Sequence, residues 1–380
     1  MTKKKLLTFF VFFVFFAALA LGWALPRRGD DSWSPGLPLP KERVKVGVIY
    51  LANPADGGYS RAHDAGILEM QRALGLNDEQ IIRKMSVSDL DKPAVELAMR
   101  DCVAQGANII VSISDGYSEA CEKLSSVFSN VIFAQVYVDL RNKTNLTHFF
   151  GRVYQARYLS GIAAGLRTKT NKIGYVAAMG RENSQVTSGL NAFALGVERV
   201  NRRAQVLVKV TRRWYDPMGE TEAARALIAE GCDVLAQHCD TPNPQIAAQA
   251  AGLWGVGYNT DMSRVAPGAV ITSVLWNWGV YYTRLVQSVI DGTFTTAPYF
   301  GGLKDGVVDL APLKESLLPD GAAEAVAEAR REIESGVNGV FDGLMETNEG
   351  RTVGVEGGTL SDAVICDSLD WYYRNVREIR

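Results

Sequence analysis

The chain has 380 residues, of which 47% are hydrophobic and 22% are charged, and its formal net charge is −2. This length is enough for about two to three ordinary domains, and the balance of apolar and charged residues excludes disorder over most of the chain. A weakly acidic protein has no overall positive field to attract phosphate backbones, so nucleic acid is not expected as a partner.

The first segment of the chain has the pattern of an export signal. Lys3, Lys4 and Lys5 precede an apolar run from Leu6 to Leu25, and a basic segment followed by an apolar one is typical of a secretory signal peptide. We therefore predict a signal peptide over 1–24 and a periplasmic or other extracytoplasmic location. The run is also long enough to cross a bilayer, so an uncleaved anchor in the inner membrane is the alternative. The Pro-containing stretch 25–43 predicts an extended linker.

From residue 44 the chain alternates between short apolar runs and helical patterns. The predicted strands are 44–51, 81–87, 109–113 and 131–137, and the predicted helices between them are 59–74, 93–105 and 117–128. Strands that alternate with helices of this length indicate βαβ units and a mostly parallel sheet. The strand runs are continuously apolar, as expected for strands that are covered on both faces.

The pattern then restarts as a second α/β unit. Its predicted helices are 154–166, 185–200, 220–229 and 244–251, its predicted strands are 172–179, 205–210, 234–237 and 255–258, and a strand at 269–275 and a helix at 278–290 follow. Two such units predict an α/β protein of two lobes, with a chain that returns to the first. We assign 44–150 and 262–299 to the first lobe, 151–261 and 300–334 to the second, and 335–380 to an extension packed on the lobes. In the extension, glycines near 350 and 357 suggest short strands, and 368–376 is predicted as a final helix.

The five cysteines do not predict a disulfide framework. Cys232 and Cys239 flank one short predicted strand, which at about 3.3 Å per residue holds them too far apart to pair. A bridge between Cys102 and Cys121 stays open, but small buried hydrophobic side chains are the favoured interpretation. No Cys or His spacing matches a metal site, and we expect neither a metal nor a cofactor.

Side chains that follow the predicted strands are the candidates for a binding site, because ligands of open α/β sheets bind beyond the carboxyl ends of the strands. Six of seven such loops carry an aromatic or imidazole ring near a polar group, a combination that suits a flat heteroaromatic or sugar-like ligand. Each loop alone is equally explained by turn and capping preferences. The candidate ligand-binding residues are Tyr59, Tyr117, Trp214, His238, Asp240, Asn259, Asp261 and Trp276.

The sequence lacks the motifs of common enzyme classes. Gly57 and Gly58 do not continue into a dinucleotide or phosphate-binding loop, and the three histidines are not accompanied by a nucleophile elbow. Of these histidines, His63 and His148 are expected to be structural and His238 is the binding candidate. A nucleoside hydrolase would need a dense cluster of aspartates, and the strand ends show only single ones. We therefore predict a binding protein and not an enzyme.

Several of these stretches carry a family resemblance. They are DGGYSRAHDAG (56–66), GRVYQARYLSG (151–161), WYDP (214–217), QHCDTP (237–242), GYNTDM (257–262) and WNWG (276–279). From about residue 44 to 371 the chain resembles the basic membrane protein (BMP) family of transporter substrate-binding proteins, which includes purine nucleoside receptors. The resemblance implies a type I periplasmic-binding-protein fold, with two Rossmann-like lobes that contain parallel sheets and are joined by a hinge. It also implies delivery of a small-molecule ligand to the permease of an ABC transporter.

The resemblance extends to the ligand. Family members often hold a purine base or nucleoside between aromatic rings, with a carboxylate at the purine edge. Carried onto this chain, Tyr59 and Trp214 correspond to the stacking rings, and Asp240 and Asp261 to the edge readers, with Asn259 nearby. Tyr59 stands where relatives usually have Trp, and the lipidated Cys of many members is absent, which favours a free periplasmic form. A ligand-sensing module of a membrane signalling protein, and a sugar-like ligand, are the alternatives.

Overall fold

The computed structural model describes residues 33–137 and 139–380. The predicted signal peptide over 1–24, and the linker as far as residue 32, lie outside the described residues. The elements described below all belong to one compact unit, residues 35–380. None of the helices in the described ranges combines the length and the apolar character needed to cross a membrane.

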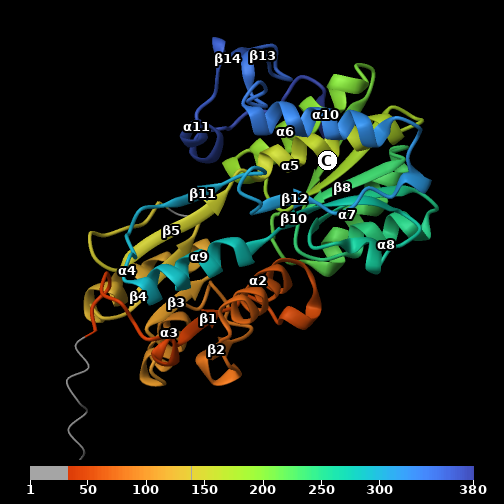
Figure 1. The fold of residues 1–380 in the computed structure, drawn as a ribbon. Helices are drawn as coiled ribbons and strands as arrows, with labels where there is room; N and C mark the ends of the chain where they lie inside the picture. The colour runs from red at the N-terminus through yellow and green to blue at the C-terminus, as the bar shows by residue number, and fades with distance from the viewer. Residues whose placement is uncertain (1–32, 138) are drawn as a thin grey trace, which may run out of the picture. The chain divides into compact units, whose positions relative to one another are not determined.

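The first sheet has six strands in the order β11-β5-β4-β3-β1-β2, and every neighbouring pair is parallel. Its strands are β1 (Val46–Ile49), β2 (Ile81–Lys84), β3 (Ile109–Ser112), β4 (Ile132–Val136), β5 (Leu146–Gly151) and β11 (Tyr299–Gly301). The helices that accompany it are α2 (Gly58–Leu74), α3 (Lys92–Ala104), α4 (Ser118–Val127) and α9 (Trp278–Asp291). Every residue of β1, β3 and β4 is buried, which confirms strands covered on both faces (Figure 1).

The second sheet has seven strands in the order β12-β10-β9-β8-β6-β7-β15. They are β6 (Lys172–Ala177), β7 (Gln205–Val210), β8 (Val234–His238), β9 (Trp254–Asn259), β10 (Val270–Trp276), β12 (Val308–Leu310) and β15 (Val376–Glu378). Within this sheet, as the structure describes it, the β10–β12 pair is antiparallel and the other pairs are parallel. The accompanying helices are α5 (Val153–Arg167), α6 (Ser184–Val200), α7 (Pro217–Ala229), α8 (Asn243–Ala250) and α10 (Ala322–Ser335).

Within residues 35–380 the chain passes three times between the two sheets. β5 of the first sheet leads directly into α5, which packs against α6 and β10 of the second. β10 of the second sheet leads into α9, which packs against α2 beside the first. β11 of the first sheet leads into β12 of the second. These three crossings form the hinge region, and the two sheets with their helices are the two lobes predicted from the sequence.

Two predictions about the later part of the chain are wrong. Residues 262–299 were assigned to the first lobe, but β10 pairs in parallel with β9 of the second sheet, and the chain crosses back only after Trp276. Residues 368–376 were predicted as a helix, but the last helix is α11 (Asp362–Asp367), which begins after the N-cap Ser361. Within that range Trp371, Tyr372 and Tyr373 are buried, and they lead into the edge strand β15.

Two other expectations are confirmed. The glycine-rich part of the extension forms an antiparallel hairpin of β13 (Asp342–Glu346) and β14 (Thr352–Thr359). All five cysteines are free, and Cys102, Cys121, Cys232 and Cys239 are buried. They contribute apolar volume to the cores of the lobes rather than covalent bridges.

Candidate ligand-binding cleft

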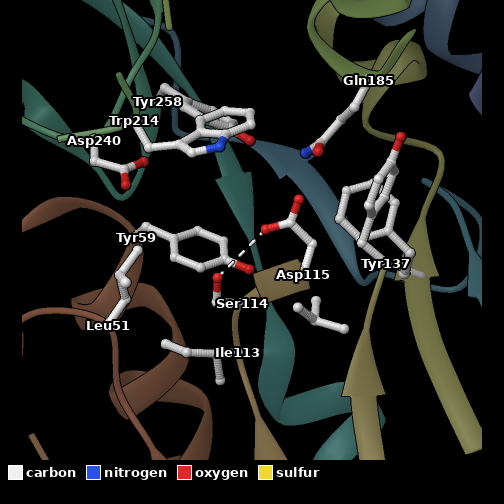
Figure 2. Close-up of a pocket in the computed structure, with 12 residues that line it drawn as sticks. Leu51, Tyr59, Ile113, Ser114, Asp115, Tyr137, Gln185, Trp214, Asp240 and Tyr258 are labelled. Atoms are coloured by element: carbon white, nitrogen blue, oxygen red, sulfur yellow. Dashed lines mark hydrogen bonds between the residues drawn. The ribbon is translucent and has the colours of Figure 1, made fainter. Parts of the chain in front are cut away.

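A cavity lies where strand ends of both sheets meet. The cavity is lined from both lobes by Leu51, Tyr59, Ile113, Ser114, Asp115, Val136, Tyr137, Phe150, Gln185, Trp214, Asp240 and Tyr258 (Figure 2). Its position beyond the carboxyl ends of parallel strands is where open α/β sheets bind ligands.

The first lobe supplies an apolar base and one carboxylate. Leu51 and Ile113 follow β1 and β3, and Val136 ends β4, so the three strand ends present apolar side chains to the cavity. Asp115 begins the short 3₁₀ turn Asp115–Tyr117, where its Oδ1 accepts a hydrogen bond from the Gly116 backbone N–H at 2.9 Å. Asp115 is exposed, and Figure 2 shows its carboxylate directed into the space below Trp214.

Two glycines allow Tyr59 to reach the cavity. Gly57 precedes α2 at φ 87°, and Gly58 opens the helix at φ 66°; both conformations are left-handed and favour glycine. Gly58 also lies against the second lobe, because a Cβ built there would be 1.6 Å from the Asp240 carbonyl oxygen. The start of α2 therefore touches the loop after β8, and this contact brings Tyr59 and Asp240 into the same cavity.

The ring of Tyr59 is braced from behind by His63. The two rings meet edge to face at 4.4 Å, and His63 in turn stacks on Trp278 at 4.6 Å. His63 Nδ1 lies 2.5 Å from the Tyr282 hydroxyl. Burial lowers the pKa of His63 well below its ordinary value, so the ring is neutral. This geometry supports the structural role predicted for His63.

The second lobe presents Trp214 from the loop between β7 and α7. Asp216 caps α7 by accepting a hydrogen bond from the Gly219 N–H at 3.0 Å, and Glu220 Oε1 accepts from the Asp216 N–H at 3.1 Å. The Trp214 carbonyl accepts a hydrogen bond from the Asp240 N–H at 2.9 Å. The loop is thus fixed both to its own helix and to the end of β8, which sets the position of the indole.

Asp240 and Glu220 form a buried pair of carboxyl groups behind this loop. Glu220 Oε2 accepts hydrogen bonds from the Thr241 hydroxyl at 2.6 Å and from its N–H at 3.2 Å. Burial, reinforced by Glu220, raises the pKa of Asp240 well above its ordinary value, and burial also raises the pKa of Glu220. Only the Asn259 amide donates to Asp240 within the described chain, at 3.4 Å. The Asp240 carboxyl group can therefore act as a hydrogen-bond donor as well as an acceptor.

The raised pKa of Asp240 predicts that stability falls as pH rises. The unfolded-state pKa is about 3.9, so above it the folded protein holds a proton that the unfolded chain has lost. The free energy of unfolding then decreases with pH, by at most about 1.4 kcal/mol per pH unit for one proton, until the folded-state pKa is passed. Thermal unfolding between pH 5 and 9 should show a flatter profile for Asp240→Asn than for the wild type. Identical profiles would contradict the raised pKa.

Tyr258 closes the cavity on the second-lobe side and is held by two neighbours. The Arg157 guanidinium lies 4.0 Å from the centre of its ring, and Trp276 Nε1 donates to its hydroxyl at 3.0 Å. Arg157 is fully buried and donates to the Gln237 carbonyl at 2.6 Å. The contact with the buried guanidinium and the hydrogen bond from Trp276 fix the position of the Tyr258 ring in the cavity wall.

Figure 2 shows how these groups face one another. The Trp214 indole lies across the space from the Tyr59 ring, and Tyr258 lies beside the indole. Asp115 and Gln185 reach toward the same space, while Asp240 lies near the other end of Trp214. Two aromatic faces with polar groups at the rim can hold a flat molecule and form hydrogen bonds to its edge.

Three of the eight residues predicted from the sequence line this cavity, namely Tyr59, Trp214 and Asp240. The other five lie elsewhere in the described structure. Tyr117 is buried in the first-lobe core, where its hydroxyl donates to the Val87 carbonyl at 2.6 Å. His238 lies behind the wall, edge to face with Tyr258 at 4.7 Å. Asn259, Asp261 and Trp276 line a neighbouring groove around the start of α2.

Sequence reasoning missed six polar or aromatic residues of the cavity: Ser114, Asp115, Tyr137, Phe150, Gln185 and Tyr258. Ser114 and Asp115 follow the predicted strand 109–113, so their positions were detectable. Phe150 belongs to a crossing, and Gln185 lies in the first turn of α6, just beyond the strand-end loop considered. The pattern alone does not show which side chain of a helical turn points into a cleft.

Comparison with known proteins assigns a family to this arrangement. Residues 43–338 match the Bmp family model, described as ABC transporter substrate-binding protein PnrA-like. A purine-binding protein of Brucella abortus is 30% identical over 310 residues, which cover 82% of this chain and 86% of that protein. A putative ABC transporter glucose-binding protein of Haloferax volcanii is 31% identical over 280 residues, which cover 73% of this chain and 70% of that protein.

Solved structures agree on the fold. A solute-binding protein of an ABC transporter system from Conexibacter woesei aligns with a TM-score of 0.63 at 22% identity, over 77% of this chain and 97% of that one. A transcriptional activator of the comK gene from Bacillus halodurans aligns with a TM-score of 0.66 at 20% identity, over 77% of this chain and 98% of that one. The fold is that of the type I periplasmic-binding proteins, and the chain belongs to the Bmp family of ABC transporter substrate-binding proteins.

Proposed function

We propose that this substrate-binding protein holds a purine base or nucleoside in the cleft between its lobes and delivers it to the permease of an ABC importer. The observation that carries the proposal is the pair of rings, Tyr59 from the first lobe and Trp214 from the second, that face one cavity. The Brucella relative, which is named as purine-binding, supports this ligand class. Solute-binding proteins of this family work outside the cytoplasm, in agreement with the predicted export signal.

Recognition follows from the groups around the two rings. A purine has a large flat face and an edge with both donors and acceptors, so stacking supplies affinity and the edge supplies selectivity. In this proposal Asp115 and the Gln185 amide, which line the cavity, bond this edge, and Asp240 adds a buried carboxyl group that can donate or accept. A ligand that left such a buried group unpaired would bind much more weakly.

Closure of the lobes explains how occupancy is signalled. A ligand that contacts both Tyr59 and Trp214 favours the arrangement in which the two lobes are together, because only that arrangement provides both contacts. The permease can then distinguish the loaded protein by the relative position of its lobes. A hydrolase is the less supported alternative, since no group of three or more His, Cys, Asp or Glu residues in the described part of the chain is arranged to hold a metal ion.

A sugar is the second candidate ligand, because the Haloferax relative is named as a putative glucose-binding protein. Aromatic rings also stack on sugars, but a hexose carries hydroxyl groups around its whole rim and requires many polar partners. This cavity presents mostly apolar and aromatic side chains, with Asp115, Gln185 and Asp240 as its main polar groups. The composition of the wall therefore favours a heteroaromatic ring.

Isothermal titration calorimetry tests the proposal directly. We expect saturable heat with at least one of adenine, adenosine, hypoxanthine and guanosine, and none with glucose. Trp214→Ala should weaken the purine signal, whereas the matched variant Trp254→Ala, at the start of β9 and outside the cavity, should not. Heat with glucose and with none of the purines would refute the proposed ligand class while leaving the family assignment intact.

A further inference from the structure

The C-terminal residues 339–380 lie beyond the segment that matches the family model, which ends at 338. They form the β13–β14 hairpin, the short helix α11 and the strand β15. Figure 1 shows the hairpin and α11 beside α6 and α10, and α11 packs against α6. We call residues 339–380 the C-terminal segment. It contacts both the hinge region and the wall of the ligand cavity.

The end of the C-terminal segment is firmly attached to the second lobe. β15 pairs in parallel with β7, with Val376 opposite Val206. Asn191 of α6 is fully buried and holds the segment twice, since its amide donates to the Trp371 carbonyl at 2.7 Å and its oxygen accepts from the Tyr373 N–H at 2.8 Å. Arg374 adds an ion pair with Glu198 at 2.9 Å. The second lobe therefore carries the segment as a fixed part.

From this anchor, α11 reaches the hinge region. The Asp362 carboxylate accepts two hydrogen bonds from Arg152, from Nε at 3.0 Å and from Nη2 at 2.7 Å, and one from the Tyr154 hydroxyl at 2.9 Å. Arg152 lies at the crossing between β5 and α5, and its Nη1 donates to the Phe300 carbonyl of β11 at 2.7 Å. Asp362 therefore fixes the side chain of Arg152, which links the β5–α5 crossing to the β11–β12 crossing.

The same helix also reaches the ligand cavity. The Tyr137 hydroxyl donates to the Cys366 carbonyl at 3.1 Å, and Tyr137 is a first-lobe residue that lines the cavity. Its ring meets Phe150, another cavity residue, edge to face at 5.0 Å. Tyr137 has φ 68°, and a non-glycine residue in this conformation is retained only where its surroundings hold it. The Cys366 carbonyl is one of the groups that hold it.

We propose that the C-terminal segment is a strap across the ligand cleft, which positions Tyr137 in the cavity wall, holds the β5–α5 crossing through Asp362, and slows opening of the cleft. The strap is anchored on the second lobe and bonded to a first-lobe residue, so separation of the lobes has to break the Tyr137–Cys366 contact or move α11. Asp362 is a positioning residue, because it acts through Arg152. The part that concerns ligand release rests on the function proposed above.

Hydrogen–deuterium exchange of the full-length protein without ligand tests the strap independently of any ligand. Asp362→Asn removes the charge but keeps the size of the side chain, and Tyr137→Phe removes the hydroxyl but keeps the ring. We expect both variants to exchange faster than the wild type in peptides covering 146–158. Glu332→Gln is the matched control, because it breaks a two-point ion pair between Glu332 and Arg199 that joins α10 to α6 and not to the hinge region. The side chains of Glu332 and Arg199 are 28% and 30% exposed. These values are comparable to the 36% and 31% of Asp362 and Arg152.

Ligand kinetics give the second readout. With adenosine as the probe, stopped-flow tryptophan fluorescence should show a dissociation rate raised roughly two- to fivefold in Asp362→Asn, as expected for one partly exposed ion pair, and unchanged in Glu332→Gln. Exchange rates equal to wild type in both strap variants would overturn the proposal. If adenosine and the other purines fail to bind the wild type, the proposed function fails, and the exchange result alone decides whether the strap exists.

Discussion

Replacing Gly58 with alanine is expected to weaken ligand binding by about tenfold or more and to lower stability. An alanine at φ 66° is strained by about 1–3 kcal/mol, and its Cβ would stand 1.6 Å from the Asp240 carbonyl oxygen, which is backbone and cannot rotate away. The start of α2 would have to move from the loop after β8. Tyr59 would move with it, and a displacement that costs about 1.4 kcal/mol of contact with the ligand corresponds to tenfold in Kd.

Gly75→Ala is the matched control for this change. Gly75 follows the other end of the same helix at φ 62°, and among the described residues the atom near its Cβ position is the flexible Lys41 Nζ at 3.6 Å. Both variants introduce similar backbone strain into α2, but only Gly58→Ala separates the helix from Asp240. Thermal unfolding should therefore show a loss for both, and titration with a purine should show a loss of affinity for Gly58→Ala alone. Equal affinities would mean that the contact does not position Tyr59.

Replacing Trp214 with alanine is expected to have the second large effect. Removal of an aromatic ring that stacks on a base costs about 1–3 kcal/mol, which corresponds to a Kd raised about 5- to 150-fold. Trp214→Phe should recover part of the affinity, because a smaller ring still provides a flat face. Trp214 also packs against the second-lobe core, but the fold should be preserved because the backbone bond from Asp240 and the Asp216 cap still fix the loop.

Tyr215→Ala controls for disturbance of the loop that carries Trp214. Tyr215 is adjacent in the chain and 45% exposed, and it does not line the cavity. Its replacement should leave the Kd within about twofold of wild type, as is usual for exposed positions. Calorimetry on the three variants separates stacking from loop damage. If Tyr215→Ala weakened binding as much as Trp214→Ala, the stacking role of the indole would be excluded.

The sequence predicted the lobes and their strands well because buried parallel strands read as continuous apolar runs. β10 shows where that information ends. The apolar run of β10 was correctly predicted as a strand, but it was assigned to the wrong lobe. Its pairing with β9 depends on where the chain crosses between the lobes, and not on the apolar pattern of β10 itself. The same holds for β15, three residues whose role as an edge strand is set by contacts with β7.

The cleft was predicted in part for a similar physical reason. Strand-end position correctly suggested that Tyr59, Trp214 and Asp240 share a region, because the carboxyl ends of parallel strands meet at one edge. It did not distinguish these from Tyr117, whose ring turns into the core, because the direction of a side chain within a turn depends on packing. Gln185 enters the cavity because of the position of α6, and Tyr137 enters it because its own backbone is left-handed. Neither feature is visible in the apolar pattern of the sequence.

The strand orders also determine when each sheet can be completed during synthesis of the chain. The first sheet includes β11, at 299–301, and the second includes β12 and β15, the latter at 376–378. A lobe built from the beginning of the chain alone would leave the edge at β5 or β7 unpaired, and unpaired edges favour association with other chains. Completion of the first sheet therefore waits for β11, and completion of the second waits for β15, so until each strand is synthesised its neighbouring edge has to be protected from other chains.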